Sequence, residues 1–149
     1  MLADLKRYHK EMRMLLDELD ELAGEPVPSM ERLPAVRLAL TRASRGRTML
    51  LEQLHATLIE RATPAQRIAL EAFKAEGKHN LTVSAQHIGS WTLREITSRW
   101  SDYCKASNRM RADMRQRIAR EEALVYPLLA GEQAYLNRGA TAPPSKTAF

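Results

Sequence analysis

The chain has 149 residues, of which 44% are hydrophobic and 28% charged, and its formal net charge is +5. This length suits one domain with a hydrophobic core of its own, which needs no disulfide bond or metal ion as a staple. The single cysteine excludes an internal disulfide bond and is typical of a reducing compartment. No apolar run approaches the roughly 20 residues that cross a bilayer, and the first residues lack the order of a secretion signal. We therefore expect a cytoplasmic protein without a membrane partner.

The positive charge is spread along the chain. Arginines alternate with Asp and Glu in segments such as ERLPAVRLALTR and RADMRQRIAREE. A solvated helix face of mixed charge explains this pattern as well as a nucleic-acid surface does. Nucleic-acid binding is therefore kept only as an alternative.

The first predicted helix carries apolar residues at alternating spacings of three and four, which mark one buried face of a helix. These residues are Leu5, Tyr8, Met12, Leu15, Leu19 and Leu22. Gly24 is expected to end the helix, and Pro26 and Pro28 make the next stretch a loop.

A second helix is predicted to begin between Ser29 and Pro34 and to end near Arg61. Its apolar face is interrupted by Arg47, which follows Gly46, a residue that weakens a helix by about 1 kcal/mol relative to Ala. The third helix begins after Thr63, where Thr-Pro-Ala-Gln forms a capping box with proline at the first helical position. We expect this helix to continue through Gly77, because its apolar face resumes in phase at Leu81.

The segment TLRE predicts a second capping box, at Thr92, that opens the last helix. Pro127 is expected to bend or end this helix. Periodicity is lost after Gly131, so residues 1–131 are predicted to form the domain and 132–149 a disordered tail. Four long amphipathic helices with short connections predict an all-α, up-down-up-down four-helix bundle.

Polar residues interrupt the apolar faces at the middle of these helices. They are His9, Arg47, Arg117 and Glu121, and they form a candidate polar pocket together with the space left by Gly77. A buried charge must be paired or solvated, and the interior of a helical bundle is a common place for a binding site.

The same positions resemble those of the bacterial hemerythrin-like (HHE cation-binding) domain family. That family carries His-apolar-x-x-Glu-Glu and then apolar-Tyr/Phe-Pro-Leu in its fourth helix. The segment RIAREEALVYPLL is similar, with Arg117 in the place of the histidine and Glu121 retained. The segment LKRYHKEMRMLLDELDEL resembles the family's first helix, with Tyr8 in the place of a glutamate and His9 in the ligand position.

The two middle helices depart further from the family. In RGRTMLLEQLHATL, Arg47 stands for a histidine and Leu51 for a glutamate, while Glu52 is one position late. In AEGKHNLTVSAQHI, Gly77 replaces a histidine. The resemblance implies a diiron site. Of the family's ligand positions, however, only those of His9 and Glu121 still carry a residue that can bind a metal, and arginine cannot become a ligand. We therefore expect no diiron centre, no metal site and no cofactor.

The replacements have a physical interpretation. Arg117 and Glu121 are four residues apart on one helix and can pair, and Arg47 can reach the same layer. Gly77 would leave the space that a guanidinium group needs. In the alternative interpretation, both arginines cover the edge of the core with their stems and extend their charged ends into solvent.

No nucleophile–base arrangement, phosphate-binding loop or nucleotide fingerprint is present, so an enzyme is not expected. The sequence favours a hemerythrin-like bundle that acts as a regulatory or interaction module for a protein partner or a small anion. A protein that binds metal or dioxygen through iron at an atypical site is the first alternative. A basic helical protein that binds nucleic acid is the second.

Overall fold

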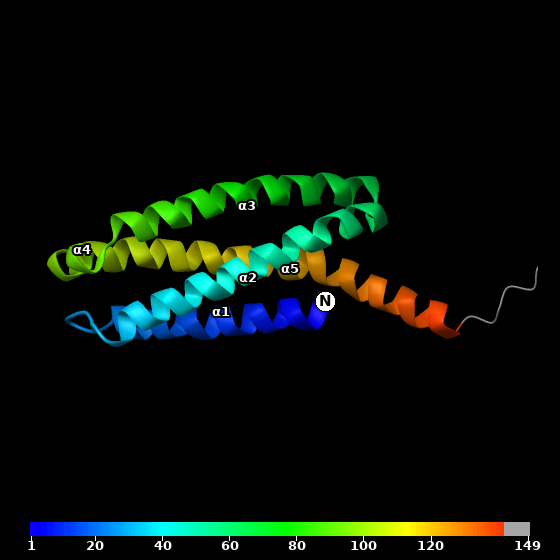
Figure 1. The fold of residues 1–149 in the computed structure, drawn as a ribbon. Helices are drawn as coiled ribbons and strands as arrows, with labels where there is room; N and C mark the ends of the chain where they lie inside the picture. Colours follow the sequence, from blue (N-terminus) through cyan, green and yellow to red (C-terminus); the bar gives the residue numbers. More distant parts are fainter. Residues whose placement is uncertain (142–149) are drawn as a thin grey trace, which may run out of the picture.

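The computed structural model describes the backbone of residues 1–141 and the side chains of residues 1–131, and this part of the chain is all-helical without a strand (Figure 1). The helices are α1 (Leu2–Ala23), α2 (Arg32–Arg61), α3 (Pro64–Ser90), α4 (Leu93–Ser98) and α5 (Trp100–Thr141). The predicted all-α class is therefore confirmed. Within residues 1–141, no helix is long and apolar enough to cross a membrane.

The four long helices run in alternating directions along one axis (Figure 1). Helix α1 packs most extensively against α2 and also contacts α5. Helix α2 contacts α3 and α5, and the short helix α4 contacts α5. This arrangement brings the middle turns of α1, α2 and α5 to the same height.

Local capping explains where α3 begins. The Thr63 side chain accepts a hydrogen bond from the Gln66 backbone N–H, and the Gln66 side chain accepts one from the Thr63 N–H, as the sequence predicts. The helix then continues without a break through Gly77, which confirms the predicted continuity.

The last predicted helix is divided in two, which corrects the sequence prediction. Thr92 caps α4 by accepting a hydrogen bond from the Glu95 N–H, but Arg99 leaves the helical conformation and α5 begins at Trp100. At this break the Trp100 indole N–H donates a 2.9 Å hydrogen bond to the carbonyl of Glu25, in the loop after α1. A tertiary contact thus outweighs the regular helix at Arg99.

Helix α5 passes through Pro127 and extends to Thr141. Proline removes one backbone hydrogen bond from the helix, but it does not end α5. The sequence predicts a disordered tail from residue 132, whereas positions 132–141 are helical. The remainder of that predicted tail, 142–149, lies outside the described residues.

The hydrophobic core has two parts, separated by a polar layer. One cluster gathers Met12, Leu16, Leu19, Leu22, Leu33, Val36, Leu40, Ala43, Ile96, Tyr103 and Ile118. The other gathers Leu5, Leu54, Leu58, Ala62, Leu70, Val125 and Leu129. Between them lie the buried side chains of His9, Arg47, Arg117 and Glu121, which we call the polar layer.

Helix α3 contributes little to this core. Leu70 is its only buried residue. Leu81, at which the sequence predicts the apolar face to resume, is 42% exposed, and Ile88, seven residues further along α3, is 44% exposed. The period of the apolar residues is helical, but the face that they form is not covered by neighbouring helices.

Gly46 permits the close approach of α1 and α2. A Cβ atom at this position would lie 2.6 Å from Cε1 of the Tyr8 ring. Atoms do not approach this closely without displacement, so the glycine that weakens α2 as a helix is required for its contact with α1.

We predict that Gly46→Ala destabilises the protein, although alanine at an open helical site stabilises by up to about 1 kcal/mol. The overlap with Tyr8 should lower the free energy of unfolding by about 1–3 kcal/mol, measured by urea denaturation. Gly89→Ala is the matched control, because an added Cβ there meets no atom within 4 Å. Equal effects of the two substitutions would contradict this explanation.

Candidate functional site

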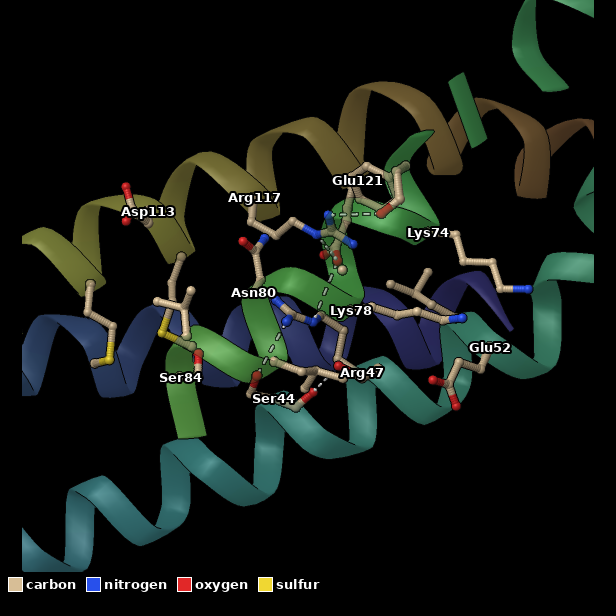
Figure 2. Close-up of a pocket in the computed structure, with 18 of the residues that line it drawn as sticks. Ser44, Arg47, Glu52, Lys74, Lys78, Asn80, Ser84, Asp113, Arg117 and Glu121 are labelled. Carbon is tan, nitrogen blue, oxygen red and sulfur yellow. Dashed lines mark hydrogen bonds and ion pairs between the residues drawn. The ribbon is translucent and has the colours of Figure 1, made fainter. Parts of the chain in front are cut away.

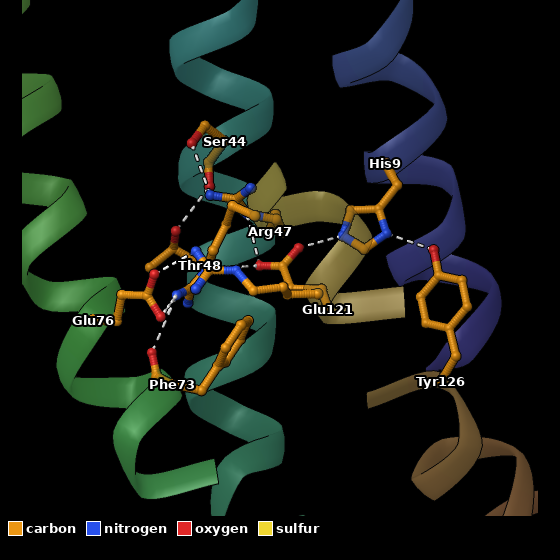
Figure 3. A network of polar contacts seen from close by, with 10 residues as sticks. His9, Ser44, Arg47, Thr48, Phe73, Glu76, Glu121 and Tyr126 are labelled. Atoms are coloured by element: carbon orange, nitrogen blue, oxygen red, sulfur yellow. Dashed lines mark hydrogen bonds and ion pairs between the residues drawn. The ribbon is translucent and has the colours of Figure 1, made fainter. Parts of the chain in front are cut away.

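Glu121 is the centre of the polar layer. Its side chain is fully buried, and its Oε2 atom accepts a 2.5 Å hydrogen bond from His9 Nε2 (Figure 3). Its Oε1 atom lies 3.5 Å from the Nε atoms of both Arg47 and Arg117. Side chains from α1, α2 and α5 therefore converge on one carboxylate.

His9, on α1, links this carboxylate to Tyr126, which lies five residues further along α5 (Figure 3). The distance from His9 Nδ1 to the Tyr126 hydroxyl is 2.5 Å, and the two rings are stacked. In a neutral imidazole, Nε2–H donates to Glu121 and Nδ1 accepts from the tyrosine. Burial, with a smaller effect from the nearby charge of Glu122, raises the pKa of Tyr126 to about 12, so the hydroxyl keeps the proton that it donates.

Arg117 is held from three sides. Its guanidinium carbon lies 3.5 Å from the centre of the Phe73 ring, and its Nη1 donates to the Phe73 carbonyl at 3.2 Å. Nη1 also lies 3.9 Å from Glu76, which forms an ion pair with Arg120. A Cβ on Gly77 would be 2.9 Å from Nη2 of Arg117, so the glycine leaves the room that the guanidinium occupies.

The guanidinium group of Arg47 has fewer polar partners than that of Arg117. Its residue is 8% exposed, and its Nη2 donates a long 3.3 Å hydrogen bond to Ser44 Oγ. Nε and Nη1 are buried and have no hydrogen-bond partner among the described residues. Burial lowers the pKa of Arg47, partly offset by the charge of Glu121, but arginine stays protonated in proteins. The layer thus contains a buried cation with unused donors.

These positions distinguish the two interpretations of the arginines. Arg47 and Arg117 are each 8% exposed, and both face Glu121 rather than solvent. The interpretation in which both extend their charged ends into solvent is wrong. Two guanidinium groups share one carboxylate, which leaves the layer with an excess positive charge when His9 is neutral.

A cavity of about 510 Å³ opens beside the polar layer, between α2, α3 and α5 (Figure 2). Arg47, Arg117 and Glu121 form part of its wall. Six cationic side chains border the cavity, against three anionic ones. The cationic side chains are Arg47, Lys74, Lys78, Lys105, Arg109 and Arg117, and the anionic ones are Glu52, Asp113 and Glu121. The cavity is therefore suited to a negatively charged ligand.

Several residues of the site do not follow from the sequence patterns. Tyr126 lies in the segment VYPLL, which resembles a family motif, but its spacing of five from Glu121 does not place the two residues on one helix face. Phe73 has a side chain typical of a core position, yet its ring stacks on a charged group. Met110 and Met114 precede Arg117 at helical spacing on α5, whereas His87 lines the cavity from α3, and no local pattern connects it to the other candidate residues.

The residues of the polar layer do not fit a diiron centre. Such a centre needs several histidines and bridging carboxylates that converge from facing helices. Here His9 and Glu121 bind each other, and two guanidinium groups lie where a cation would have to approach the carboxylate. In residues 1–131, no group of three or more His, Cys, Asp or Glu side chains is arranged to hold a metal ion.

Comparisons with protein-family models, with curated proteins and with solved structures found no match to this chain. The resemblance to hemerythrin-like domains therefore rests on the sequence motifs alone.

We predict that Glu121→Gln lowers the free energy of unfolding by about 3 kcal/mol, because the two buried guanidinium groups lose their common counter-charge. Glu122→Gln is the matched control on the same helix, since Glu122 pairs with the exposed Arg13 and should contribute less than about 1 kcal/mol. Chemical denaturation measures both. A loss that is no larger for Glu121 than for Glu122 would show that the polar layer does not depend on the carboxylate.

Proposed function

We propose that this protein is a hemerythrin-like four-helix bundle without a diiron centre, and that it acts as a cytoplasmic regulatory module by binding a small anion at Arg47 and Arg117. The observation that carries the proposal is the buried guanidinium of Arg47. Its Nε and Nη1 atoms lack hydrogen-bond partners among the described residues, and its side chain borders the cavity. Nε faces Glu121 at 3.5 Å, so an anion oxygen that reaches Nη1 would satisfy the remaining donor and neutralise the excess charge of the layer.

The bundle itself supports this role. Helices α1, α2 and α5 fix the arginines from packed positions, and α3 closes over them without filling the space. A binding site that is held rigidly on one side and loosely on the other is suited to a ligand that changes how α3 packs. Binding can then alter the surface offered to a protein partner, which is what a regulatory module requires.

We predict that a small anion such as acetate, benzoate or phosphate binds the purified protein and that Arg47→Met weakens this binding by about tenfold or more. Isothermal titration calorimetry measures the Kd. The matched control is Arg45→Met, which removes an exposed arginine from the same helix and should leave the Kd unchanged. Equal binding by all three proteins would refute the proposed site, as would the absence of any binding by the parent protein.

Metal content tests the first alternative function. Protein purified without a chelator or an affinity tag should contain iron, manganese and zinc well below one equivalent per chain, with no oxo-bridge absorption. About two irons per chain would instead indicate a metal- or dioxygen-binding protein with an atypical site.

A further inference from the structure

The cavity is divided along its length between charged and apolar walls. Gly77 faces Arg117 at one point, and His87 stacks on Tyr103 with a ring separation of 6.1 Å at another. Helices α3 and α5 run side by side between these two contacts. The cavity-lining residues in this interval include an apolar or small set that comprises Leu81, Ser84, Ala106, Met110 and Met114.

Charged side chains are placed differently. In Figure 2, Lys74 and Lys78 lie on one side of the paired arginines, and Ser84 and Asp113 lie on the other. Arg109 and Asp113, which also border the apolar interval, are exposed and have opposite charges. The excess of positive charge is therefore largest at the arginines and the two lysines. Along the apolar interval, the charges of Arg109 and Asp113 offset each other, and the exposed Lys105 adds one positive charge at the border of the cavity.

At its far end, the apolar interval is bordered by the exposed Lys105 and by His87. Burial, helped by the nearby charge of Arg37, lowers the pKa of His87, so its imidazole is neutral at physiological pH. The two methionines have flexible, polarisable side chains that adapt to the shape of an apolar ligand. Leu81, at the border of the cavity, is 42% exposed and has apolar surface still available for contact.

The length of this interval limits the size of the ligand. The ten residues from Gly77 to His87 span about 15 Å along the axis of α3. An extended hydrocarbon chain advances by about 1.2 Å for each bond, as the extended polypeptide backbone does. A chain of about a dozen carbons therefore reaches from the arginines to His87.

We infer that the anion bound by this protein is the carboxylate of an unbranched fatty acid of about a dozen carbons. Its head group lies at Arg47 and Arg117, and its chain lies between α3 and α5 toward His87. This inference rests on the proposed function, because it uses the same two arginines and adds the identity of the ligand. A small inorganic anion would satisfy the arginines but would leave the apolar walls exposed to water.

The experiment compares ligands in which the charged head group and the length of the hydrocarbon chain are varied separately. Butanoate, octanoate and dodecanoate share one head group, and dodecyltrimethylammonium carries the longest chain with the opposite charge. All are titrated below their aggregation concentrations into the full-length protein by calorimetry. We expect the Kd to fall by about two- to fourfold for each added methylene, and the cationic amphiphile not to bind or compete.

Two substitutions on α3 test the position of the chain. Leu81→Asp places a carboxylate at the border of the apolar interval and should weaken dodecanoate by about tenfold or more while leaving butanoate unchanged. Because Leu81 is largely exposed, this variant should fold even if Arg47→Met does not, and circular dichroism checks both. Ile68→Asp is the matched control, since Ile68 is 73% exposed and does not line the cavity.

The outcomes are separable. Arginine-dependent binding of butanoate and dodecanoate with equal affinity would overturn the inference and leave the proposed function intact. Binding of dodecanoate that is insensitive to Leu81→Asp, or equally strong binding of the cationic amphiphile, would also overturn the inference. Failure of every anion to bind would overturn both.

Discussion

The structure depends on the burial of one carboxylate. Glu121 has no exposed surface, so its charge is stable only if cations and hydrogen-bond donors reach it inside the protein. His9 comes from α1, Arg47 from α2 and Arg117 from α5 itself. Displacing α1 or α2 by one turn would remove one of these partners from the buried carboxylate. The polar layer thus fixes the register of the helices, which two clusters of interchangeable aliphatic residues specify less strongly.

The same constraint explains why α3 stands apart. The guanidinium of Arg117 occupies the space next to Gly77 and stacks on Phe73, so α3 rests on a charged group at its middle. Aliphatic side chains cannot interdigitate at that point as they do between α1 and α2. The cavity follows from this arrangement, and its wall keeps the donors of Arg47 that no other described side chain satisfies.

The sequence predicted some parts of the molecule well. The face of α2 from Leu33 to Leu58 is buried as its spacing indicates, including Arg47, because α2 lies between other helices and has a fully covered face. The pairing of Arg117 with Glu121 follows from a separation of four residues on one helix. Predictions from residue spacing of this kind are reliable where neighbouring helices pack against the predicted face.

Other features depend on contacts between segments that are distant in sequence, and the spacing of apolar residues does not predict such contacts. Leu81 and Ile88 have the spacing of core residues but are exposed. The sequence could not predict this, because an apolar helix face has the same spacing whether or not another helix covers it. The break at Arg99 lies next to a hydrogen bond from Trp100 to the loop after α1. Gly46 looked like a local weakness, and only its distance to the Tyr8 ring shows that a larger residue does not fit.

The weak attachment of α3 has a consequence for the dynamics of the protein. Leu70, near its first turn, is its only buried side chain, and the capping box at Thr63 fixes the same end. The opposite part of α3 makes few buried apolar contacts, and such segments separate from a protein at free energies far below that of global unfolding. Amide hydrogens along the second half of α3 should therefore exchange with solvent much sooner than those of α1 and α2. Local opening of the stretch between Leu70 and His87, whose ring stacks on Tyr103, would admit a molecule to the cavity while the two hydrophobic clusters stay folded.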